Sequence, residues 1–79
     1  MKSAAITTLD QLILGKTYRV TGAYWMNSPT LMFIGRYMGT NLMTNTATFE
    51  ITTTQTIVFR ADVLDTELVN GDVIAVALD

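Results

Sequence analysis

The chain has 79 residues, enough for one small domain spanning 1–79, and it contains neither Cys nor His. The missing Cys excludes disulfides and thiolate metal sites, and the missing His removes the usual general base and the commonest metal ligand. The net charge of −2 argues against nucleic acid as the main partner, because phosphate binding depends on Lys and Arg.

The first predicted element is a short helical turn that follows a frayed lead, Met1–Thr7. Thr8 and Gln11 have the spacing of a capping box, which predicts a single turn beginning at Thr8. Alternating residues then predict a half-buried strand over Lys16–Tyr24. The next segment, Trp25–Pro29, contains Asn, Ser and Pro and is predicted to be a turn.

The second predicted strand, Leu31–Met38, is apolar on both faces. Gly35 within it predicts a bulge or sharp bend of the kind that curls a sheet into a barrel. With Phe33 and Tyr37 assigned to the core, the opposite face becomes an exposed stripe. The apolar members of this stripe are Met32, Ile34 and Met38.

The remaining predicted elements begin with a polar loop, Gly39–Thr46. It leads to a hairpin of two strands, Ala47–Thr52 and Thr56–Arg60. An acidic segment, Ala61–Leu68, is predicted to form one 3₁₀ or α turn. The last strand, Asp72–Leu78, is apolar on both faces, so we expect it to be central, or closed against both the first strand and a cap.

This layout predicts an all-β fold. The specific expectation is a small five-stranded SH3-like barrel with a short N-terminal helical turn and a 3₁₀ or α turn before the last strand. Closure would remove the exposed strand edges. The alternative is a five-stranded OB-like barrel, which would need a helix between the third and fourth strands, and the sequence predicts none there.

Three segments carry a resemblance to a known family: LDQLILGKTYRV at 9–20, IGRYMG at 34–39 and Thr48-Phe49-Glu50. Over residues 9–60 they resemble the small SH3-like barrel proteins of large DNA viruses of algae and protists. The resemblance implies a viral origin and a virion or host-interaction role, and it carries over no functional residue. The low charge departs from the more basic members expected of that family.

Two groups of residues are candidate interaction sites. Tyr24 and Trp25 lie at the lip of a predicted turn, where they either contact a partner or fold back as a lid on the core. The methionines give adaptable surfaces, and an exposed apolar stripe usually marks an interface. The alternative is that a strongly curled barrel packs the stripe under the N-terminal turn. The predicted interaction residues are Tyr24, Trp25, Met26, Met32, Ile34 and Met38.

Charge is divided unevenly along the chain. Residues 1–60 carry +3 and residues 61–79 carry −5. If the fold keeps them apart, a basic and an acidic side could support head-to-tail self-association; the alternative is ordinary intramolecular pairing. The acidic run from Asp62 to Asp72 does not match the calcium-loop spacing. It is predicted to be a solvated cap or an ion-pair partner for Arg60 and Arg36.

The sequence therefore predicts a non-enzymatic structural or protein-interaction module without cofactor or metal, which self-associates or docks on a larger assembly, such as a virion. The first alternative is a nucleic-acid-associated barrel using Lys16, Arg19, Arg36 and Tyr37. The second is a peptide-binding adaptor using Tyr24 and Trp25. No signal peptide or membrane span is predicted, so we expect the protein in a cytoplasm, that of a host if it is viral, or in the virion.

Overall fold

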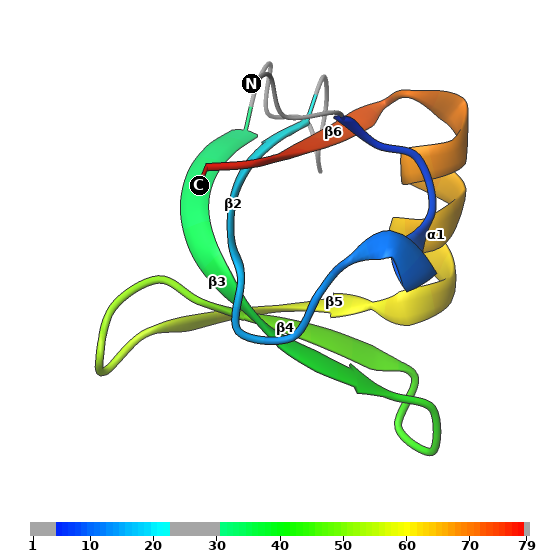
Figure 1. Cartoon of the computed structure of the whole chain (residues 1–79). Helices are drawn as coiled ribbons and strands as arrows, with labels where there is room; N and C mark the ends of the chain where they lie inside the picture. The colour runs from blue at the N-terminus through cyan, green and yellow to red at the C-terminus, as the bar shows by residue number, and fades with distance from the viewer. Residues whose placement is uncertain (1–4, 23–30, 79) are drawn as a thin grey trace.

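The computed structural model describes residues 5–22 and 31–78. Within them, six strands and two helical segments follow one another along the chain (Figure 1). In chain order they are β1 (Ala5–Ile6), the 3₁₀ helix η1 (Leu9–Gln11), β2 (Thr17–Gly22), β3 (Leu31–Asn41), β4 (Thr46–Glu50), β5 (Thr56–Arg60), α1 (Ala61–Asn70) and β6 (Val73–Ala77).

The strands form one sheet in the order β1-β6-β2-β3-β4-β5, and every neighbouring pair is antiparallel. The last strand, β6, lies between β1 and β2, which agrees with the central position predicted from its two apolar faces. β1 and β5 stand at the two ends of the order, so in the described residues the sheet is not closed. The protein is thus a small, mostly antiparallel β domain with one short α-helix.

The strand missing from the sequence prediction is β1, which lies in the expected frayed lead. Ala5 pairs with Val76 and Ile6 pairs with Ala75 along β6. Ile6 also packs against the core. Two residues are too few to show an alternation pattern. This strand forms because β6 offers backbone groups at its edge that need hydrogen-bond partners.

The acidic segment before β6 forms a ten-residue helix, α1, instead of the single turn predicted. Ala61, Leu64 and Leu68 are buried along one side of it, at the helical spacing. Gly71 ends the helix with a left-handed φ of 82°, and its N–H donates to the Leu68 carbonyl oxygen at 3.3 Å. Packing of the buried side on the sheet extends the helix, because tertiary contacts supply most helical stability in proteins.

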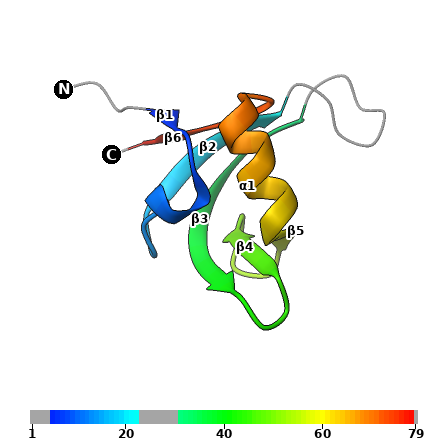
Figure 2. The same cartoon turned by 90° about the vertical axis from the view of Figure 1, so that its right-hand side faces the viewer.

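α1 and η1 lie on one side of the sheet, which we call its inner face (Figure 2). The core lies between these two helices and the sheet. It centres on the rings of Phe33, Phe49 and Phe59, whose centroids are 5.5 to 6.0 Å apart. Phe33 and Tyr37 are 9% and 6% exposed, so their predicted assignment to the core is confirmed. The other buried core residues are Leu12, Tyr18, Val20, Ala47, Leu64, Leu68, Val73 and Ala75.

Of the bulge or sharp bend predicted at Gly35, the bulge is absent there, because the pairing of Gly35 with Tyr18 of β2 is regular. A Cβ at this position would lie 3.2 Å from both Phe33 Cε1 and Phe49 Cβ, so glycine is needed here for space. The irregularity instead falls between Tyr37 and Gly39, where the register with β4 shifts. Gly39 has a φ of +112° that other residues rarely adopt, which is why the bulge lies there.

Candidate functional site

The first candidate surface is the outer face of the sheet, which turns away from α1. Side chains alternate along each strand, so the residues between the buried ones point to this face. On β3 these include Met32, Ile34 and Met38, whose side chains are 66%, 54% and 44% exposed. The stripe predicted to lie outside therefore lies outside, and it does not pack under the N-terminal segment.

The strand register extends part of this stripe across three strands. Two rows of side chains run over β3, β2 and β6, and each row has an apolar residue at both ends. The rows are Met32–Thr21–Ile74 and Ile34–Arg19–Val76, in the order β3, β2, β6. We call these six residues the outer patch.

Ile74 and Val76 were not among the residues predicted to interact. Alternation marks them as one face of the last strand, but only the register of β6 on β2 places them in the same rows as Met32 and Ile34, across β2. Ile74 is 46% exposed. Arg19, between Val76 and Ile34, is exposed, and no ion pair joins it to another residue of the described ranges. The outer patch is therefore an apolar surface around one cation.

Met38 lies on the same face but outside the outer patch. The ion pair between Arg36 Nη2 and Glu50 Oε1, at 2.6 Å, separates it from Ile34. Arg36 and Glu50 face each other in the register of β3 and β4. The partner of Arg36 is therefore Glu50, whereas Asp62 of the acidic segment is the partner of Arg60.

The other predicted interaction residues have different positions. Tyr24, Trp25 and Met26 lie outside the described residues. Met43, which is not among the predicted interaction residues, is 96% exposed in the turn that follows β3. Tyr37 is buried, so its ring does not join Arg36 in an exposed stacking surface for nucleic acid.

A groove of about 770 Å³ lies between η1, the β3–β4 turn and the start of α1. Two of its carboxylates already accept hydrogen bonds from the chain. Asp65 Oδ1 accepts from the Leu9 backbone N–H at 2.8 Å, and Asp10 Oδ1 accepts from the Thr8 hydroxyl at 2.5 Å. The bond from Leu9 to Asp65 holds η1 against α1, whereas the bond from Thr8 to Asp10 is local, so the groove marks the contact between two elements.

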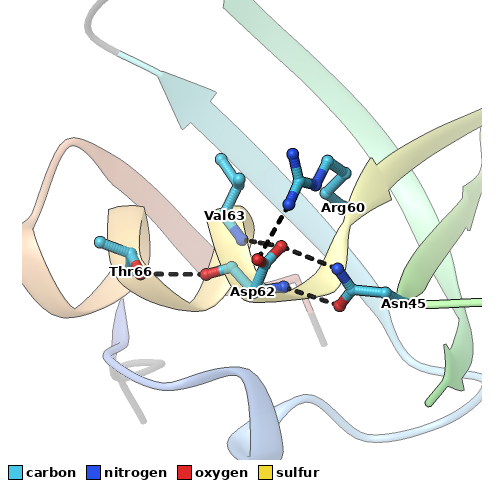
Figure 3. Close-up of polar contacts among 5 residues, drawn as sticks. All are labelled: Asn45, Arg60, Asp62, Val63 and Thr66. Atoms are coloured by element: carbon cyan, nitrogen blue, oxygen red, sulfur yellow. Dashed lines mark hydrogen bonds and ion pairs between the residues drawn. The ribbon is translucent and has the colours of Figure 1, made fainter.

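The third carboxylate of this groove, Asp62, takes part in the capping of α1 by the β3–β4 turn (Figure 3). The Arg60 side chain does not cap the helix. Instead the Asn45 carbonyl oxygen accepts from the Ala61 N–H at 2.8 Å, and Asn45 Oδ1 accepts from the Asp62 N–H at 3.2 Å. Asn45 Nδ2 donates to Asp62 Oδ1 at 2.9 Å. The sequence gives no local signal for this cap, because the two partners are 17 residues apart.

The electrostatics of Asp62 follow from these contacts. The hydrogen bond from Asn45 lowers the pKa of the Asp62 carboxyl below 3.8, with help from the Val63 N–H and from Arg60. Arg60 Nη2 lies 3.1 Å from Asp62 Oδ2. The ion pair predicted between the acidic segment and Arg60 is therefore present.

A second, smaller groove of about 330 Å³ runs along the exposed side of α1 and the turn after it. Burial raises the pKa of Glu67 above 4.5, and the neighbouring Asp72 carboxylate adds to the rise. We call this feature the acidic groove, and its lining residues are Asp62, Val63, Thr66, Glu67, Asn70 and Asp72.

Within residues 5–22 and 31–78, no cluster of three or more His, Cys, Asp or Glu side chains could hold a metal ion. No helix of that part is both long and apolar enough to cross a membrane. Comparisons of the chain with protein-family models, with curated proteins and with solved structures find no match.

Proposed function

We propose that this protein is a non-enzymatic interaction module whose contact surface is the outer patch. The observation that carries the proposal is the pair of rows in which Met32 and Ile34 of β3 and Ile74 of β6 are 46% to 66% exposed on one face, with Thr21 and Arg19 of β2 between them. Exposed apolar side chains that form a contiguous patch usually mark a protein interface, whereas scattered ones need no explanation. Methionine supports such a role because its flexible side chain adapts to a partner.

The proposal also includes a more specific assignment of the fold. We propose that the open sheet is related to an SH3-like barrel. The support is that β6 lies beside β2, the strands β2 to β5 follow one another in order, and a helical segment precedes the last strand. A viral origin and a place in a virion remain proposals that rest on the resemblance of residues 9–60.

Sedimentation velocity over a concentration series tests the proposal, with Met32→Glu as the variant. We expect the wild-type chain to sediment as an oligomer and Met32→Glu to sediment as a folded monomer, because a buried carboxylate at the contact would be unpaired. Met43→Glu is the matched control, since it makes the same change at a residue that is exposed outside the outer patch. Circular dichroism checks that both variants fold.

If the wild-type chain is monomeric, a second experiment is needed, in which the wild-type chain and both variants are immobilised as baits. A partner that is held by the wild type and Met43→Glu but lost with Met32→Glu supports docking through the outer patch. An oligomer that Met32→Glu leaves intact overturns the proposal. So does a monomer whose wild-type and Met32→Glu baits retain the same proteins.

A further inference from the structure

Given the proposed role of the outer patch, we infer that its occupant is the acidic groove of a second copy of this chain. Copies would then associate head to tail. The inference rests on the proposed function, and it adds the identity of the partner and the surface that the partner offers.

The part of the acidic groove that α1 forms and the outer patch lie on opposite sides of the sheet. Leu64 and Leu68 of α1 are buried against the inner face of the sheet, so the exposed side of the helix points away from the sheet. The outer patch lies on the other side of the sheet. One copy therefore presents both surfaces, which approach each other near the start of β6, where Asp72 of the groove precedes Ile74 of the patch by two residues.

The charges of the two surfaces are complementary. The outer patch contains Arg19 and no carboxylate, and the neighbouring Arg36 and Glu50 neutralise each other. The acidic groove contains three carboxylates, and one of them, that of Asp62, forms an ion pair with Arg60. Residues 61–70 include no Lys or Arg. A cation at the centre of one surface thus matches an excess of negative charge on the other, which orients the contact and speeds encounter.

The apolar parts of the two surfaces also match. Val63, the apolar residue that lines the acidic groove, is 42% exposed. Met32 and Ile34 of the outer patch can cover this side chain, since burial of apolar area supplies most of the affinity of protein contacts. Arg19 is then expected to approach Glu67, because a carboxylate accepts several hydrogen bonds and keeps capacity beside its contact with Asp72.

A symmetric contact between two outer patches is less favourable. A twofold axis through the patch would place the two copies of Arg19 close to each other, and like charges that meet in an interface destabilise it. Head-to-tail contact avoids this repulsion. It also leaves a free patch at one end and a free groove at the other, so it produces a ring or a filament, not a closed dimer.

The test is a charge exchange, measured by sedimentation velocity at two salt concentrations. Arg19→Glu and Glu67→Arg should each weaken association by roughly thirtyfold or more. The double variant Arg19→Glu/Glu67→Arg should recover most of it, because the ion pair is restored with its signs reversed. Asp10→Arg is the control: it makes the same change of charge at an exposed carboxylate of η1 and should leave association unchanged.

The expected wild-type result is a mass that grows beyond a dimer with concentration and falls as salt is added. Met32→Glu separates the two proposals. If it dissociates the assembly while Glu67→Arg does not, the outer patch is an interface with another occupant, and only the head-to-tail inference is wrong. A wild-type chain that stops at a dimer, stays monomeric, or is not rescued by the charge exchange also overturns the inference.

Discussion

Gly35 of β3 and Phe49 of β4 approach so closely on the inner face that a Cβ on Gly35 would lie 3.2 Å from the Phe49 Cβ. Optimal contact between carbon atoms is about 3.5–4.0 Å. The Phe49 Cβ is fixed to its strand, so it can move only if β4 moves. The missing side chain at Gly35 is therefore what lets the rings of Phe33 and Phe49 pack edge to face at 5.5 Å.

Gly35→Ala should lower the free energy of unfolding by about 1–3 kcal/mol, which is the usual cost of overpacking a core. Urea denaturation measures this change. The double variant with Phe33→Leu tests the reason, because a smaller side chain at 33 makes room for the new methyl group. If crowding is the cause, the double variant loses less stability than the two single variants together. A Gly35→Ala protein as stable as wild type would show that the rings move aside easily.

Alternation along β3 is what made the two faces of that strand predictable. A period of two fixes Phe33 and Tyr37 on one side and Met32 and Ile34 on the other, whatever the rest of the fold does. The alternation along β3 does not indicate which strands lie next to it in the sheet. Ile74 joins Met32 only because β6 pairs with β2, and that register depends on contacts more than 50 residues apart in the chain.

The elements that the sequence did not predict, β1 and the full length of α1, also depend on contacts between distant parts of the chain. β1 has only two residues and forms because β6 offers it an edge. α1 extends to ten residues because Leu64 and Leu68 pack on the sheet and because Asn45 caps its first turn. These contacts are nonlocal, whereas sequence signals for helix ends are local. The uneven charge of the two parts of the chain was visible in the sequence, but the pairing of Arg60 with Asp62 and the exposed position of Arg19 depend on the fold.

Asn45→Gly should destabilise the protein by about 1 kcal/mol, the usual value of a helix cap, because the Asp62 N–H loses the acceptor Oδ1. Asn45→Ala should cost more, since Asn45 has a φ of 57°, which glycine adopts freely and alanine does not. Urea denaturation of both variants separates the cap from the backbone strain. If Asn45→Gly and Asn45→Ala were equally stable, the positive φ at this position would not strain alanine.

The same Asn45 variants should change how Asp62 titrates. The hydrogen bond from Asn45 is the largest cause of the lowered pKa of Asp62, so its loss should raise that pKa towards 3.8. Carboxyl chemical shifts followed by NMR through acidic pH measure it. A group with a lowered pKa stabilises the folded state above its unfolded pKa, and the contribution is lost as pH falls. Asn45→Gly should therefore show a smaller loss of stability to acid than wild type over this range.

Asp65→Ala should release η1 from α1. The carboxylate accepts from the Leu9 N–H at 2.8 Å, and these two residues are 56 positions apart. A hydrogen bond to a charged acceptor contributes about 1.5–3 kcal/mol, less where solvent reaches it. Amide hydrogen exchange at Leu9 is expected to speed up more than exchange in β2 or β3. Asp10→Ala is the comparison, because its carboxylate accepts a local hydrogen bond from the Thr8 hydroxyl, two residues away. Uniformly faster exchange across the sheet would instead indicate global destabilisation.

Glu67→Gln should stabilise the folded protein at neutral pH. Burial and the nearby Asp72 carboxylate raise the pKa of Glu67 above 4.5, so the folded chain holds this proton more tightly than the unfolded chain does. The stability due to Glu67 is then fully present below pH 4.5 and is lost as pH rises through the folded pKa. Glutamine resembles the protonated acid at every pH, so the gain should appear at pH 7 and disappear below pH 4.5.

Asp62→Asn provides a control of opposite sign for Glu67→Gln, because the pKa of Asp62 is lowered by Asn45, Val63 and Arg60. Removal of its charge should reduce the urea midpoint at pH 7, where the ionised carboxylate stabilises the fold. Both variants are compared with wild type by urea denaturation at pH 7 and pH 4, at low protein concentration so that association does not contribute. If Glu67→Gln and Asp62→Asn shift the midpoint in the same direction at pH 7, a general effect of net charge explains them better than the local contacts do.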